Sequence, residues 1–181
     1  MQEASDRARR FVMHKYAKDR TLNLYQRAEF AGLVYSDGDE SERRIEGAVH
    51  HAKVLDTFSS ELADSISDWP SEYHLSRQRH CLVRPLGIKA GDRVLELGSG
   101  CGAITRFLGE IGADVTAVEG SVQRARIAAE RCRDLPNVKI VTNDLVLLGT
   151  EERFDCVLAL LVGLLKYAPM FSAEPGIRVR A

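Results

Sequence analysis

Residues 94–102 read Val-Leu-Glu-Leu-Gly-Ser-Gly-Cys-Gly, and this stretch decides the fold. A short apolar run leads into three alternating glycines, Gly98, Gly100 and Gly102, and a helix-forming segment follows. Where side chains are missing the backbone can approach a ligand closely, and the first amides of a helix point toward it. The order of strand, glycine turn and helix therefore predicts a ligand-binding turn.

The rest of this half of the chain repeats the same rhythm. Strand-like runs cover 93–97, 114–118, 138–141 and 154–161, and helical stretches cover 103–111 and 121–134. Such alternation is typical of βαβ units, whose strands form a parallel sheet with a ligand crevice at their carboxyl ends. We therefore expect an α/β fold with a Rossmann-like parallel sheet.

The N-terminal part has a different pattern of polar and apolar residues. Residues 1–36 have moderate helical character, and residues 36–44 are polar enough for a linker. Apolar residues at helical spacing predict one long helix over 43–66. Trp69-Pro70 should end that helix, and a second helix is expected over 72–86 before the loop 87–92. We expect a helical N-terminal extension over 1–70 and a Rossmann-like domain over 71–181.

Composition narrows the class of protein. The 181 residues are 45% hydrophobic with a net charge of −1, so no overall field attracts nucleic acid or anionic lipid. The four cysteines lack metal-ligand spacing, the first residues do not read as a signal peptide, and the longest apolar run, 156–165, is too short to span a bilayer. We expect a cytoplasmic protein with no metal, no membrane contact and no nucleic-acid substrate.

Glu96 distinguishes between two kinds of nucleoside ligand. The sequence from Gly98 to Ala103 also fits the dinucleotide fingerprint, whose pyrophosphate would be repelled by a carboxylate two residues earlier. A buried carboxylate instead favours a ligand with a cationic end, such as S-adenosyl-L-methionine. The structural alternative is that Glu96 pairs with a neighbouring arginine.

Two further positions follow the next strands. Glu119 ends the second strand, where an acid can accept hydrogen bonds from both ribose hydroxyls, or can instead favour the N-terminus of the next helix. After the third strand, Asp144 and the amide of Leu145 can read an adenine edge, although Asp144 is also an ordinary turn former.

Residues 73–172 resemble the class I S-adenosylmethionine-dependent methyltransferases. VLELGSGCG looks like the glycine motif of that family, TAVEGS its ribose acid, TNDL its adenine contact and FDCVLALLVGLLKYAP its fourth-strand motif. The last motif is similar to methyltransferase domains found beside glycosyltransferases in bacterial surface-polysaccharide proteins, which carry Glu where this chain has Lys166. The resemblance implies Glu96, Gly98, Gly100, Gly102, Glu119, Asp144 and Leu145 as cofactor-binding residues.

Two departures from the family pattern bear on function. Residues 159–162 read Ala-Leu-Leu-Val where members that methylate adenine or amides carry an Asn/Asp-Pro-Pro-aromatic tetrad, which disfavours those acceptors. The family's sheet also continues beyond the fourth strand, so we expect a chain truncated after it. The exposed apolar edge of the fourth strand would then favour self-association or binding of a partner.

No residue stands out as a catalytic base. Methyl transfer mainly requires an aligned and desolvated nucleophile, and His74, His80, Lys166 and Tyr167 are candidates to assist it. We expect a methyltransferase acting on a small molecule or glycan. The alternatives are an NAD(P)-dependent oxidoreductase and a non-catalytic, truncated remnant.

Overall fold

The structure is a computed structural model that describes residues 16–27, 30–33, 38–143 and 152–159. Its centre is a six-stranded sheet in the order β1-β2-β5-β4-β3-β6. The strands are β1 (Tyr16–Lys18), β2 (Leu24–Arg27), β3 (Arg93–Leu97), β4 (Asp114–Glu119), β5 (Val138–Thr142) and β6 (Cys156–Ala159). All neighbouring strands are parallel except β1 and β2, which form an antiparallel pair.

The expected βαβ core is confirmed. Helix α5 (Ala103–Glu110) connects β3 to β4, and α6 (Val122–Arg131) connects β4 to β5. Gly112 adopts φ 87° where α5 ends, and the Ser121 side chain accepts a hydrogen bond from the Arg124 amide to cap α6. After β5 the chain returns to the other side of β3, so the direction of winding reverses between β3 and β6, where open α/β sheets bind ligands.

The expectation of moderate helical character in the N-terminal segment was wrong for residues 16–27, which contain β1 and β2. Asp19 Oδ1 accepts hydrogen bonds from the Thr21 and Leu22 amides and so closes the turn between the strands. β2 then pairs with β5, far away in the sequence, and Leu24 is completely buried. This long-range pairing overrides the moderate local helix preference.

The single long helix expected over 43–66 is two helices, α2 (Asp39–His51) and α3 (Ser60–Asp64). Residues 39–44, assigned to the linker, lie inside α2. Polar groups between the helices explain the break: the Thr57 amide donates to Glu110, and Ser59 caps α3 by accepting from the Leu62 amide. Such side-chain bonds offer the backbone an alternative to the helix.

The helix expected over 72–86 is shorter and starts earlier. Trp69-Pro70 opens α4 (Trp69–Leu75) instead of ending the preceding helix, because Asp68 and Ser71 form a reciprocal capping box around its first turn. These hydrogen bonds from Ser71 lower the pKa of Asp68 to about 2. Two 3-10 turns, η1 (Arg79–Leu82) and η2 (Arg84–Leu86), follow α4 and lead to the loop before β3.

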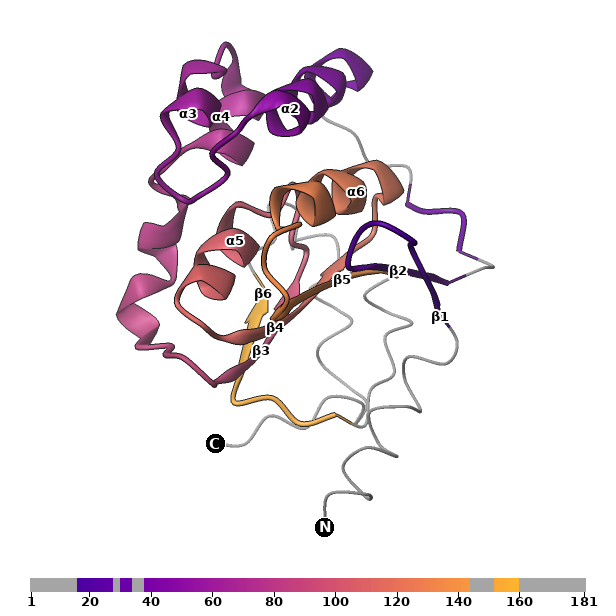
Figure 1. Ribbon diagram of the computed structural model, residues 1–181, viewed down its shortest axis with the longest axis vertical. Helices are drawn as coiled ribbons and strands as arrows, with labels where there is room; N and C mark the ends of the chain where they lie inside the picture. The colour runs from indigo at the N-terminus through magenta and orange to yellow at the C-terminus, as the bar shows by residue number, and fades with distance from the viewer. Residues whose placement is uncertain (1–15, 28–29, 34–37, 144–151, 160–181) are drawn as a thin grey trace, which may run out of the picture.

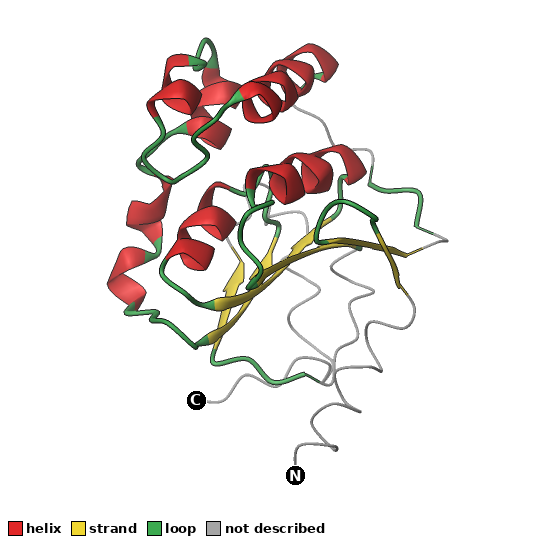
Figure 2. Cartoon of the chain, in the orientation of Figure 1, coloured by secondary structure: helices red, strands yellow, loops and turns green. Residues whose placement is uncertain are grey.

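The described elements form three layers (Figures 1 and 2). Helices α5 and α6 cover one face of the sheet, and α2, α3 and α4 lie on the far side of α5 and α6. A hydrophobic core joins the sheet to α5 and α6, and a second core joins α2, α3 and α4 to Cys101 and Ile127. The sheet takes two strands from residues before 70, while the domain boundary expected there stays a prediction.

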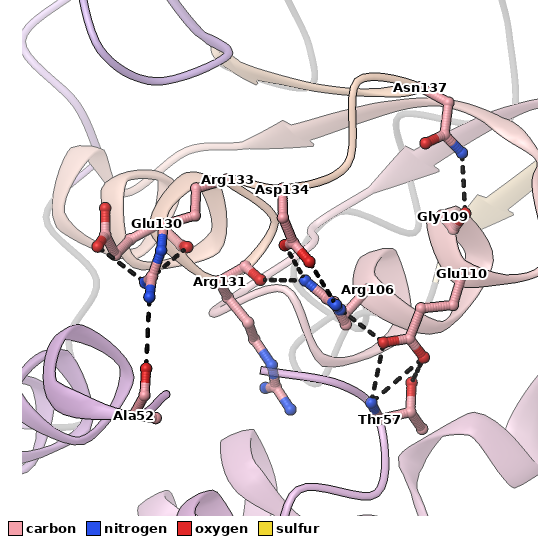
Figure 3. A network of polar contacts seen from close by, with 10 residues as sticks. All are labelled: Ala52, Thr57, Arg106, Gly109, Glu110, Glu130, Arg131, Arg133, Asp134 and Asn137. Carbon is pink, nitrogen blue, oxygen red and sulfur yellow. Dashed lines mark hydrogen bonds and ion pairs between the residues drawn. The ribbon is translucent and has the colours of Figure 1, made fainter. Parts of the chain in front are cut away.

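Polar contacts fix the outer helices to the inner layer. Figure 3 shows Arg106 between Asp134 and Glu110, while Thr57, from the loop after α2, donates to Glu110. A buried ion pair joins α2 to α6, since Arg124 Nε lies 2.9 Å from Glu42 Oε1. These contacts hold the outer helical layer against α5 and α6.

Candidate functional site

The three glycines of the motif turn the chain sharply after β3. Gly98, Gly100 and Gly102 have φ values of 77°, 55° and 78°, which residues with a Cβ rarely adopt. The Gly98 amide donates to the Val118 carbonyl at 2.8 Å, so the turn is tied to the end of β4. The sequence prediction of a glycine turn between a strand and a helix is confirmed.

Gly102 serves packing as well as turning. A Cβ at this position would lie 3.0 Å from both Cα and Cβ of Ala128 on α6. The absence of a side chain therefore lets α5 begin directly beneath α6. At Gly100 the neighbour is different, because a Cβ would lie 3.2 Å from the Cε1 atom of His74.

Glu119 binds the turn itself. Its Oε2 atom accepts a hydrogen bond from the Gly100 amide at 2.7 Å, and Oε1 accepts one from the Ser121 amide at 2.9 Å. Both sequence interpretations of Glu119 thus have a basis in the geometry, since it lies beside the glycine turn and next to the N-cap of α6. Each carboxylate oxygen has two lone pairs, so the side chain retains capacity for further donors.

Glu96 is buried at 2% exposure and accepts a 2.6 Å hydrogen bond from the Thr105 hydroxyl on α5. Within the described segments, no basic side chain lies within ion-pair distance of it, so the arginine pair considered as an alternative is not found there. Burial raises its pKa to about 7, against the effects of the Thr105 hydrogen bond and the Arg79 charge, and Glu119 adds repulsion.

Ser99 is a site residue that sequence reasoning missed. It lies between two motif glycines, is 8% exposed, and its buried Oγ has no hydrogen-bond partner among the described residues. A buried hydroxyl without a partner is costly, so a ligand atom that bonds to it would recover free energy. A small polar residue between two motif glycines was the available signal.

The two candidate histidines have different surroundings. His74, on α4, is buried with its ring against Gly100, and its carbonyl accepts a 2.7 Å hydrogen bond from Arg131 Nη1. His80 packs against the rings of Phe58 and Phe107, and neither of these contacts involves the glycine turn. The structure therefore brings His74, but not His80, into contact with the glycine turn.

The remaining sequence candidates, Asp144, Leu145, Lys166 and Tyr167, lie outside the described residues. Among the residues that the structure does describe, no group of three His, Cys, Asp or Glu side chains is arranged to hold a metal ion. No helix in those segments is long and apolar enough to cross a bilayer.

Comparison with known proteins identifies the family of this region. A family model described as a methyltransferase domain matches residues 94–172, which contain the glycine turn and Glu119. Demethylmenaquinone methyltransferase of Tropheryma whipplei (strain Twist) is 34% identical over 82 residues, covering 44% of this chain and 34% of that protein. (S)-coclaurine N-methyltransferase of Papaver somniferum is 38% identical over 80 residues, covering 40% and 22%.

Other matches have different acceptors in their names. Ribosomal RNA small subunit methyltransferase A of Streptococcus mutans is 42% identical over 60 residues, covering 33% of this chain and 21% of that protein. The chain thus spans about a third or less of the length of these relatives.

Among solved structures, a methyltransferase from Thiobacillus denitrificans in complex with S-adenosyl-L-homocysteine has a TM-score of 0.45 at 20% identity, covering 78% of this chain and 54% of that one. The sequence matches show that residues 94–172 are similar to methyltransferase domains.

Proposed function

We propose that the chain binds S-adenosyl-L-methionine at the glycine turn and is part of an enzyme that transfers the methyl group to an acceptor. The observation that carries the proposal is the position of Glu119, whose carboxylate is bonded to the Gly100 amide. An acid held at the carboxyl end of the second parallel strand can accept hydrogen bonds from ribose hydroxyls. The unpartnered Ser99 hydroxyl supports the same location for the ligand.

The residues present fit such a cofactor. Gly98, Gly100 and Gly102 leave three positions of the turn without side chains, while Ser99 offers a hydroxyl and Glu119 a carboxylate. Bound S-adenosyl-L-methionine supplies a methyl group on a positively charged sulfonium. Asp144 and Leu145 remain our proposed adenine contacts.

Glu96 supports a cationic ligand over a dinucleotide. Its carboxyl is buried, its pKa is raised to about 7, and no basic side chain of the described segments forms an ion pair with it. A nearby cation would favour ionisation of Glu96, whereas a pyrophosphate would be repelled by it.

We propose a small molecule or glycan as the acceptor. The net charge of −1 gives no general attraction to nucleic acid, although the matched relatives include ribosomal RNA methyltransferases, so the exclusion of nucleic acid stays a prediction. Of the candidate bases, His74 has the best support, because its ring contacts Gly100. Among the described strands β6 pairs with β3 alone, and association through its other edge stays a prediction, as does a cytoplasmic location.

Calorimetric titration of the purified chain with S-adenosyl-L-homocysteine and, separately, with NAD tests the cofactor. We expect a heat of binding with S-adenosyl-L-homocysteine and none with NAD. Binding of NAD without binding of S-adenosyl-L-homocysteine would reject the methyltransferase proposal in favour of an oxidoreductase.

Variants of the turn then locate the ligand. Ser99→Ala is expected to weaken S-adenosyl-L-homocysteine binding by about 1 kcal/mol without lowering the unfolding temperature, since it removes a hydroxyl that has no partner among the described residues. Glu119→Ala should weaken binding by about 1–3 kcal/mol. Asp64→Ala, at an exposed acid on α3, is the control and should leave the affinity unchanged. Unchanged affinity in both turn variants would place the ligand elsewhere.

A further inference from the structure

Two aromatic side chains on α4 and one arginine at the start of η1 form a row. The Trp69 and Tyr73 rings are stacked, with centroids 5.5 Å apart and planes 27° apart. On Tyr73, the guanidinium carbon of Arg79 lies 4.0 Å from the ring centroid. We call Trp69, Tyr73 and Arg79 the aromatic row.

The aromatic row begins next to the glycine turn. The Tyr73 ring packs edge-on against the His74 ring at 5.0 Å, and His74 in turn contacts Gly100. Arg79 is close enough to Glu96 for its charge to lower the pKa of that carboxyl. The row therefore leads outward from the proposed cofactor site, over side chains of η1 and α4.

The arginine of the row keeps its hydrogen-bonding edge available. A guanidinium stacked on a ring directs its N–H groups outward in its own plane, in a fork that matches a carboxylate or phosphate. The Arg79 backbone amide donates to the Ser76 carbonyl, but among the described residues its guanidinium has neither a hydrogen-bond acceptor nor an ion-pair partner. In contrast, Arg93 lies over Phe154 but also forms an ion pair with Glu152 at 2.8 Å.

The tryptophan of the row is open to solvent. Trp69 is 62% exposed, although an indole is among the most costly side chains to leave in water. Tyr73 and Arg79 are both partly buried, so the row has a polar inner end and an apolar, accessible outer end. Because the Arg79 charge lies against Tyr73, a second cation would be repelled here, whereas an anion would be attracted.

We propose that the aromatic row is the acceptor-recognition surface, and that the acceptor is a small molecule with an aromatic ring that carries a carboxylate. Arg79 donates hydrogen bonds to the carboxylate, and the ring packs beside it against the aromatic rings of the row. This inference rests on the proposed function, because it assigns the acceptor of the same site.

The sequence contains a single tryptophan, so tryptophan fluorescence reports on Trp69 alone. The probes are benzoate and benzamide, which have the same ring and nearly the same shape but differ in charge. We expect both to quench Trp69, with a dissociation constant about tenfold lower for benzoate, as for hydrogen bonds to a charged partner. In Arg79→Gln the preference for benzoate should disappear.

Arg77→Gln is the matched control, because Arg77 is exposed, lies two residues away and makes no ring contact among the described residues. The preference for benzoate should persist in it. Equal quenching by the two probes in the wild-type chain would overturn the inference, and this comparison stands even if Arg79→Gln does not fold. A preference that survives in Arg79→Gln, or disappears equally in Arg77→Gln, would also overturn it.

Calorimetry with S-adenosyl-L-homocysteine on the same samples separates the two proposals. Cofactor binding with equal quenching by both probes would reject the acceptor class and retain the methyltransferase. Absence of cofactor binding with selective quenching by benzoate would reject the proposed function and leave an aromatic-acid site on α4.

Discussion

Replacement of Glu96 by glutamine tests the electrostatics of the site. The carboxyl is buried at 2% exposure and accepts a hydrogen bond from Thr105, and its pKa is raised from 4.5 to about 7 mainly by burial. The glutamine amide in Glu96→Gln would have nearly the same shape and can accept the same hydrogen bond, but it carries no charge at any pH. Any pH-dependent difference between the two proteins therefore reports the ionisation of Glu96.

The sign of the effect follows from the two pKa values. Between about pH 4.5 and pH 7 the folded protein keeps the Glu96 proton while the unfolded chain releases it, so wild-type stability falls as pH rises through this window. One pKa unit corresponds to about 1.4 kcal/mol, so the full loss above pH 7 is about 3 kcal/mol. Relative to wild type, Glu96→Gln should gain this amount above pH 7 and little or nothing below pH 4.5.

Urea unfolding followed by circular dichroism at a series of pH values measures this difference. The matched control is Glu72→Gln, at an exposed position on α4, which should show no such pH dependence relative to wild type. A difference between Glu96→Gln and wild type that is the same at every pH would refute the raised pKa. Lower stability of Glu96→Gln above pH 7 would mean that the carboxylate has a stabilising cationic partner.

The same variant tests the link to the ligand. The sulfur of S-adenosyl-L-methionine is a sulfonium cation, whereas the sulfur of S-adenosyl-L-homocysteine is a neutral thioether. Wild-type preference for the cation should therefore weaken as pH falls below about 7, because Glu96 becomes protonated. In Glu96→Gln this preference should no longer change over the same pH range.

Two further substitutions test the turn and the helix contacts. Gly102→Ala should lower the free energy of unfolding, measured in urea, by at least about 2 kcal/mol, because φ is 78° and a Cβ would press on α6. The control Gly47→Ala lies in open space within α2 and should raise the free energy of unfolding by about 0.5–1 kcal/mol. Equal effects would contradict the strained turn. Glu42→Ala should cost about 3–5 kcal/mol because it leaves the buried Arg124 without this ion pair, whereas Glu40→Ala, at an exposed pair, should cost less than about 1 kcal/mol. Similar losses for both would show that the buried pair contributes little.

The sequence predicts the βαβ core well because the signals there are local. Strands buried on both faces are continuous apolar runs, and the helices between them carry their own end signals at Ser121 and Gly112. β2 has no comparable local signal. Its position depends on hydrogen bonds with β5, more than a hundred residues later, which single-sequence periodicity does not report.

The break between α2 and α3 was missed for a similar reason. Apolar residues continue at helical spacing through this region, and the break depends on polar contacts from Thr57 and Ser59. Glu110, the partner of Thr57, lies on another helix, so the sequence around the break does not reveal it. Trp69-Pro70 was expected to end a helix but opens α4 instead, because proline is common in the first turn of a helix as well as beyond its end.

In the candidate site, too, the residues with local sequence signals could be predicted, and those placed by tertiary packing could not. The glycines, Glu96 and Glu119 could be predicted because each lies in, ends or follows a recognisable strand, and Glu119 indeed contacts Gly100. The contact of His74 with Gly100 and the position of Arg79 over the Tyr73 ring depend on how α4 and η1 pack. Those relations come from tertiary packing and have no signature in residue spacing.

The packing of α4 has a consequence for function. Arg131 on α6 donates a hydrogen bond to the His74 carbonyl, and the same α6 packs on Gly102, so one helix supports both α4 and the glycine turn. Glu119 also joins the turn to the Ser121 amide at the start of α6. A ligand bonded to Glu119 would therefore meet a turn and an aromatic row that are already held in their relative positions, which lowers the conformational cost of binding both substrates.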